Sequence, residues 1–82
     1  MDSRTFIKAA GELIKKIEAS KDNIDTADEI RNQRDNMQKE VTALFNGLMN
    51  PTLSSAFNLR DTALRSGFHI EPAVLNRLAK FE

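Results

Sequence analysis

The chain has 82 residues, with twelve basic side chains, twelve acidic side chains and no cysteine. This length suits one domain with one core, so we expect a single domain over residues 1–82. A net charge of zero argues against a protein whose main task is to grip a phosphate backbone. The lack of cysteine excludes disulfides, thiolate nucleophiles and cysteine-bound zinc.

The charges are unevenly distributed along the chain. Seventeen of the 24 charged side chains precede residue 42, whereas four of the five phenylalanines follow it. The first half therefore reads as solvated surface, and the second half as the source of most of the core. The N-terminus lacks the pattern of a secretory signal, and no apolar run approaches the roughly 20 residues that span a bilayer. We expect a cytoplasmic protein that makes no membrane contact.

A first helix is predicted over about residues 3–20. Asp2 or Ser3 can cap its first turn. Apolar residues recur along it at helical spacing, which predicts one buried stripe: Phe6, Ala10, Leu13 and Ile17, widened by Ile7 and Ile14. Gly11 weakens the helix interior, and we interpret it as a point where a neighbouring helix approaches closely.

A second helix is predicted over about residues 26–46. Turn-forming residues occupy 20–25, and Thr26 with Glu29 forms a capping box. The helix carries a narrow seam of heptad spacing: Ala27, Ile30, Arg34, Met37, Val41, Leu44 and Leu48. Such a seam must lie against another helix. Because the apolar pattern runs almost unbroken through the turn, one long continuous helix is the alternative.

Arg34 is the charged position in this seam. In one interpretation its aliphatic stem lies on the seam while its guanidinium reaches water or a carboxylate such as Glu18. In the other it selects the register or the partner, as polar groups at such positions often do.

Two shorter helices are predicted at about residues 51–66 and 72–80. Asn50 and Pro51 have the residue types of a cap and a first helical position. Gly67 followed by Phe68 predicts a left-handed C-cap with its apolar contact, and Pro72 begins the last helix. The expected fold is all-α: an antiparallel helical hairpin plus two C-terminal helices that cover its closed end.

No motif for catalysis, cofactor binding or metal binding was found, so we predict a protein that is not an enzyme. The acidic residues at 22–29 lack the oxygen spacing, central glycine and closing glutamate of an EF-hand loop. His69 is the one histidine, and it has neither cysteine nor another histidine to complete a metal site. We expect it to lie in a turn beside the C-cap.

The leading hypothesis is a non-enzymatic protein–protein interaction protein of the adaptor, inhibitor or chaperone type. Such chains are common among phage and bacterial accessory proteins. The predicted interface is the seam of the second helix: Ile30, Arg34, Met37, Val41 and Leu44. We expect it to meet a protein partner or a second copy, with a homodimer favoured.

Two alternatives belong to other functional classes. Residues 59–80 contain a degenerate helix-turn-helix pattern, in which Asn76, Arg77 and Lys80 would be the nucleic-acid contacts of a DNA-binding regulator. A self-assembling subunit of a filament or capsid is the other alternative. The first is weakened because Pro72 delays the second helix and because that helix is largely apolar.

Overall fold

A computed structural model describes residues 2–20 and 27–81, apart from the side chains of residues 27 and 30. Four helices and no strand are found in these ranges, and the all-α class is confirmed. They are α1 (Ser3–Ser20), α2 (Ala27–Asn46), α3 (Ser54–Arg65) and α4 (Pro72–Ala79). No helix in the described ranges is long and apolar enough to cross a membrane.

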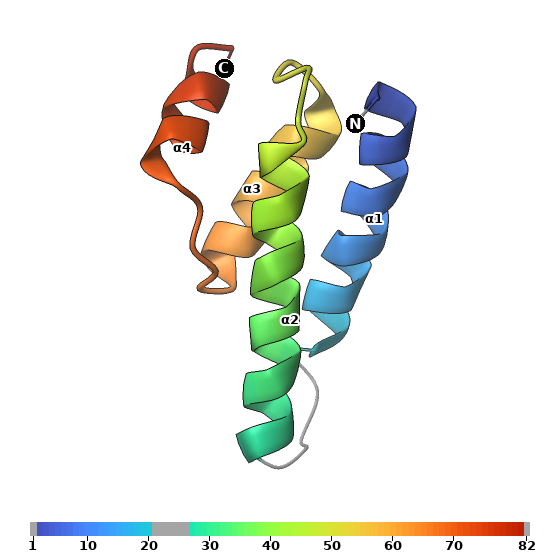
Figure 1. Cartoon of the computed structure of the whole chain (residues 1–82), viewed down its shortest axis with the longest axis vertical. Helices are drawn as coiled ribbons and strands as arrows, with labels where there is room; N and C mark the ends of the chain where they lie inside the picture. The colour runs from blue at the N-terminus through green and yellow to red at the C-terminus, as the bar shows by residue number, and fades with distance from the viewer. Residues whose placement is uncertain (1, 21–26, 82) are drawn as a thin grey trace.

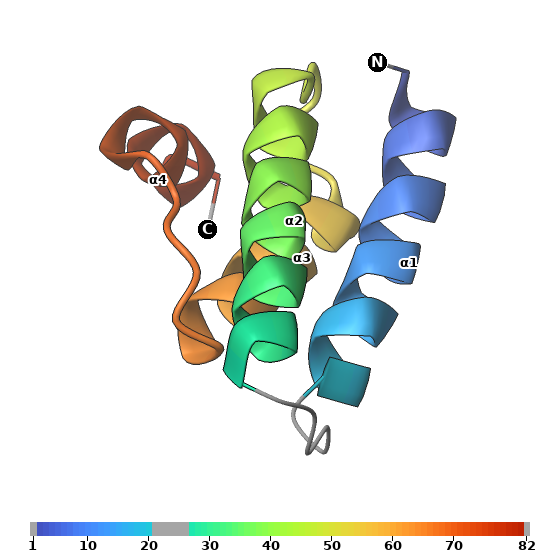
Figure 2. The same ribbon diagram turned by 60° about the horizontal axis from the view of Figure 1, so that its bottom comes forward.

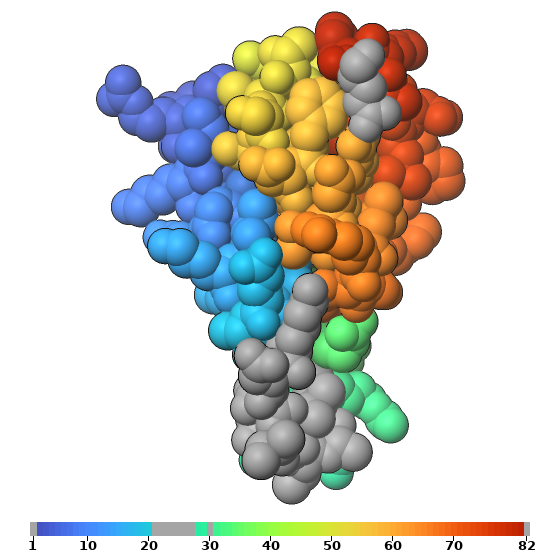
Figure 3. Space-filling view, turned by 180° about the vertical axis from the view of Figure 1, so that it is seen from behind, coloured from blue at the N-terminus to red at the C-terminus, as the bar shows by residue number. Residues whose placement is uncertain are grey.

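The helices α1 and α2 lie side by side and run in opposite directions, as Figures 1 and 2 show. This agrees with the predicted hairpin, whose connection and Thr26 capping box lie outside the described residues. We expected the two shorter helices to cover the closed end of the hairpin, and this expectation is wrong. Instead α3 packs along the side of α1, and α4 lies beside the opposite end of α2 (Figure 1). Figure 3 shows α1 and α3 side by side on the rear face.

The core is built from one buried stripe on each long helix and from the apolar residues of the second half. The rings of Phe6 and Phe45 lie 6.4 Å apart at a tilt of 57°, an arrangement that aromatic pairs favour. The buried apolar residues are Phe6, Ala10, Leu13, Ile17, Met37, Val41, Leu44, Phe45, Leu48, Ala56, Leu59, Ala63, Phe68, Ile70 and Leu78. The stripe predicted on the first helix is confirmed.

Local sequence signals explain three of the helix ends. The Asp2 carboxylate accepts a hydrogen bond from the Thr5 N–H at 2.7 Å, which caps α1. Gly67 has φ 83°, and the N–H of Phe68 donates to the Ala63 carbonyl at 2.9 Å. The predicted left-handed cap is therefore confirmed, and the Phe68 ring is buried behind it. Pro72 occupies the first turn of α4, as predicted.

The predicted start of the third helix is wrong by three residues. The helix begins at Ser54, and Leu53 is its N-cap residue with no side-chain hydrogen bond. The side-chain oxygen of Asn50, Oδ1, instead accepts hydrogen bonds from the backbone N–H and the hydroxyl of Thr52. This local side-chain turn competes with helix formation, so Pro51 lies in a turn that precedes α3.

No helix of this chain makes the close approach that we expected at Gly11. A Cβ atom placed on Gly11 meets no atom within 4 Å, so no neighbouring helix of this chain requires glycine there. Gly11 lies on a flank of α1 that its packing on α2 and α3 leaves open.

Candidate protein interface

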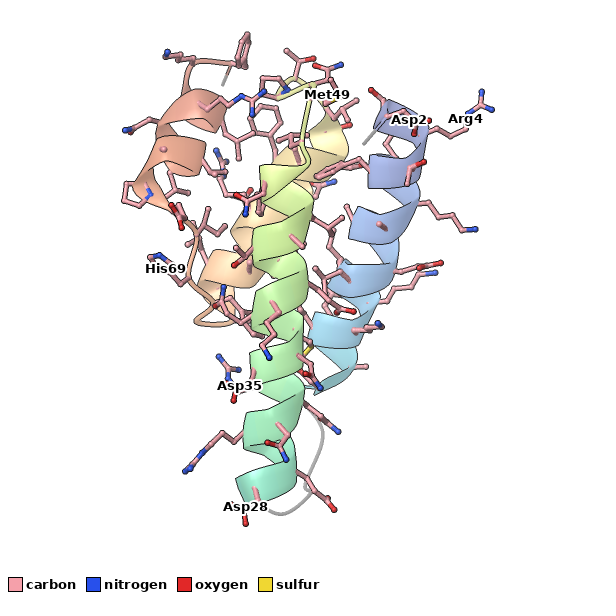
Figure 4. The ribbon with its side chains drawn as sticks, viewed as in Figure 1. Asp2, Arg4, Asp28, Asp35, Met49 and His69 are labelled. Carbon is pink, nitrogen blue, oxygen red and sulfur yellow. The ribbon has the colours of Figure 1, made fainter. Side chains whose placement is uncertain are left out.

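The N-terminal half of α2 extends past the ends of the other helices. Figure 1 shows this projection, and Figure 4 labels Asp28 near its tip and Asp35 above it. All described side chains from 28 to 36 are exposed to solvent. Among the described side chains of α2, Met37 is the first that is buried. The described side chains between residues 28 and 36 are all polar or charged, and none of them belongs to the core.

The predicted interface residues divide into two groups in the structure. Met37, Val41 and Leu44 are 6 %, 0 % and 7 % exposed and belong to the core. They pack inside the chain, which leaves only the edges of Met37 and Leu44 exposed. Ile30 lies in the projecting half of α2, and its side chain is outside the described set. The seam is therefore covered within the chain at its C-terminal end.

Arg34 reaches across to the end of α3. Its Nη2 donates to the Ser66 carbonyl at 2.8 Å, and its Cζ lies 4.6 Å from the centre of the Phe68 ring. The last carbonyls of a helix lack partners within the helix, and a cation is favoured at this end. Arg34 thus stabilises the end of α3 and contacts one face of Phe68. Among the described residues it has no bond to Glu18, the carboxylate we considered.

Gln38 makes a second connection one turn further along α2. Its Nε2 donates to the His69 carbonyl at 2.9 Å, and its Oε1 accepts from the His69 N–H at 2.7 Å. The side-chain amide satisfies both backbone groups of His69. We call Arg34 and Gln38 the α2 clamp, since together they hold residues 66–69 on α2.

The sequence alone did not reveal the clamp. Arg34 and Gln38 are four residues apart and therefore lie on one side of a helix. That spacing says nothing about residues 66–69, which are about 30 positions away in the sequence. His69 lies just after the turn at residues 66–67 rather than in it, and its backbone makes the contacts described here.

A groove of about 630 Å³ runs between the end of α1 and the middle of α2. More of its exposed lining surface is apolar than polar, although six of the eight lining residues are polar or charged. The lining residues are Lys16, Ala19, Ser20, Gln33, Asn36, Met37, Lys39 and Glu40. Lys16 Nζ and Glu40 Oε1 lie 3.2 Å apart and connect the two helices at one end of the groove. Both side chains are largely exposed, so this ion pair adds little to stability.

Of the predicted nucleic-acid contacts, Asn76 and Arg77 lie on α4, and Lys80 is its C-cap residue. Asn76, Arg77 and Lys80 are all exposed. The Arg77 guanidinium, however, donates to the Leu48 carbonyl at 3.0 Å and to the Met49 carbonyl at 3.5 Å. It thereby fastens α4 to the connection between α2 and α3. The other two side chains, those of Asn76 and Lys80, point into solvent.

No protein-family model, curated protein or solved structure matches the chain. Within residues 2–20 and 27–81, no three histidine or acidic side chains gather closely enough to hold a metal ion. The groove between α1 and α2 lies beside the exposed half of α2.

Proposed function

We propose that this protein is a non-enzymatic interaction protein of the cytoplasm, of the adaptor, inhibitor or chaperone type. It binds a helix of a partner protein in the groove between α1 and α2. The observation that carries the proposal is the groove itself, whose exposed surface is more apolar than polar and whose lining includes charged and amide side chains. An amphipathic helix that lies in a hydrophobic groove is a common mode of protein recognition.

The position of the groove supports this function. Its α2 wall includes Gln33 and Asn36, which belong to the half of α2 whose described side chains from 28 to 36 are exposed. An isolated helical segment of this polarity is only marginally stable in water. A partner helix beside it would bury surface that the chain leaves open and would stabilise the folded state by mass action.

The chemistry of the rim indicates the kind of helix that fits. Lys16, Lys39 and Glu40 supply charges of both signs, and Gln33 and Asn36 supply amides. Ala19 and the edge of Met37 supply apolar surface. A helix with a narrow apolar stripe between mixed polar flanks complements this arrangement. Apolar contacts would give the affinity, and the rim charges would fix the register.

The first experiment locates the partner. Benzoylphenylalanine at Asn36 lies in the groove, whereas the same amino acid at Ala73 lies exposed on α4. Irradiation in the cells that produce the protein should yield a cross-linked species from position 36 and none of the same mass from position 73. Identical products from both positions, or none from position 36, would contradict the groove as the binding site.

The second experiment measures binding with the purified partner by calorimetry. Ala19→Trp fills the groove, and Ala73→Trp places the same side chain on exposed α4 as the matched control. We expect Ala19→Trp to weaken the affinity by about tenfold or more, because it occupies the space of the partner's anchor. Ala73→Trp should bind like the native chain. Equal affinities for the two variants would refute the proposal.

A further inference from the structure

The helix α1 carries a second regular face that the fold covers only in part. Arg4, Ile7, Gly11, Ile14 and Glu18 are spaced three, four, three and four residues apart, so they form one stripe along the helix. We call this stripe the outer face of α1. Ile7 is 46 % exposed and Ile14 is partly buried, while Arg4 and Glu18 are exposed. The stripe is therefore apolar in the middle and charged at both ends.

The neighbouring helix extends this apolar surface. Leu64 of α3 is 46 % exposed and shares a groove of about 590 Å³ with Ile14 and Glu18. Figure 3 shows α1 and α3 side by side on the face where both are open to solvent. Ile7, Ile14 and Leu64 are three branched apolar residues that this chain leaves partly uncovered. A second copy that covered them would bury apolar surface that the fold leaves in water.

Gly11 lies at the centre of the outer face. It weakens the interior of α1, yet no described atom comes within 4 Å of where its Cβ would be. The fold therefore makes no use of the missing side chain. A helix that crosses α1 at this point could approach more closely than over any larger residue.

The charges at the two ends are arranged for self-recognition. Arg4 precedes Gly11 by seven residues and Glu18 follows it by seven. Each lies about 10 Å along the helix from Gly11, at 1.5 Å per residue. If two α1 helices cross antiparallel about a two-fold axis at Gly11, each Arg4 meets the Glu18 of the other copy. Ile7 of each copy then lies beside Ile14 of the other. Neither charged side chain forms an ion pair with the described residues of its own chain.

We propose that a second copy of this chain docks antiparallel on the outer face of α1, with the two Gly11 residues at the crossing point. Such an interface is isologous, because one surface is complementary to itself. This inference goes beyond the proposed function, since the outer face shares no residue with the groove between α1 and α2. The homodimer that the sequence favoured on the seam of α2 would thus form on α1.

Sedimentation equilibrium across micromolar to millimolar protein at low salt tests the proposal. The native chain should show a concentration-dependent dimer. Gly11→Leu places a bulky side chain at the crossing point and should abolish the dimer. Glu12→Leu adds the same side chain to an exposed position on the flank of α1 that faces α2, and should dimerise like the native chain.

Charge reversal adds a test that a general loss of folding could not imitate. Arg4→Glu and Glu18→Arg each place like charges opposite one another at both ends of the crossing. Each should weaken the dimer by about tenfold, since two surface ion pairs become two repulsions. The double variant restores opposite charges and should dimerise like the native chain.

Three outcomes would overturn the inference: a native chain that stays monomeric at every concentration, a dimer that survives Gly11→Leu, or a double variant no better than the single ones. None of these outcomes bears on the groove, whose test uses variants at positions 19 and 73. The two proposals can therefore fail separately.

Discussion

The same substitution, glycine to alanine, should change stability in opposite directions at Gly11 and Gly67. At Gly11 the backbone is helical and a Cβ meets no atom within 4 Å. Replacing an interior helical glycine by alanine should stabilise the folded monomer by about 1 kcal/mol. At Gly67 φ is 83°, a conformation that costs an L-residue roughly 1–2 kcal/mol. The new Cβ would also lie 3.3 Å from Arg34 Nη2, so the hydrogen bond of Arg34 to Ser66 would have to shift.

The two variants should therefore differ by about 2–3 kcal/mol in the free energy of unfolding. For a domain of this size, that difference separates their Tm values by roughly 8–24 °C. Thermal and urea unfolding, followed by far-UV circular dichroism in dilute solution, measure both quantities on the monomer. Gly11→Ala should unfold above the native chain, and Gly67→Ala below it.

Lys15 supplies the control, because it is exposed in the interior of α1. Lys15→Gly should be less stable than Lys15→Ala by about 1 kcal/mol, which gives the helix propensity term alone. If Gly11→Ala lowers the Tm, or if Gly67→Ala leaves it unchanged, then the open space at one position and the strained backbone at the other are misassigned.

Three further predictions address the seam, the clamp and the first helix cap. Met37→Ala should lower the free energy of unfolding by about 2–5 kcal/mol in urea titrations, because Met37 is buried inside the chain. The loss should be the same at all protein concentrations. A loss that grows on dilution would instead mean that the seam lies between molecules. Gln38→Leu removes both bonds to the His69 backbone and should speed hydrogen exchange of the His69 amide in NMR spectra, whereas unchanged exchange would mean that another group protects it. Hydrogen bonds from the Thr5 side chain and N–H to the Asp2 carboxylate hold its pKa below the ordinary value. A carboxyl whose pKa is lower in the folded than in the unfolded state stabilises the fold above its unfolded pKa, and this contribution is lost as the pH falls through the folded pKa. The urea midpoint of the native chain should therefore fall relative to Asp2→Asn below about pH 4, and a pH-independent difference would contradict the cap.

Local sequence patterns determined where the helices lie and how several of them end. The stripe from Phe6 to Ile17 predicted α1, and Gly67 with Phe68 predicted the cap of α3. These features follow from side chains and backbone groups only a few residues apart, so the relevant energies can be read from the sequence. The start of α3 was missed because the side chain of Asn50 has two local options, a helix cap and a turn with Thr52.

Only the tertiary structure decided what each surface meets. The heptad spacing required a cover for Met37, Val41 and Leu44, yet the same spacing suits a cover from this chain or from another molecule. In the structure the chain's own core provides that cover. Arg34 and Gln38 bind backbone groups of residues about 30 positions further along the chain. Which groups they bind likewise depends on how α3 and α4 pack beside α2. Such contacts arise from the sum of many small packing terms across the molecule, and no short segment of sequence contains that sum.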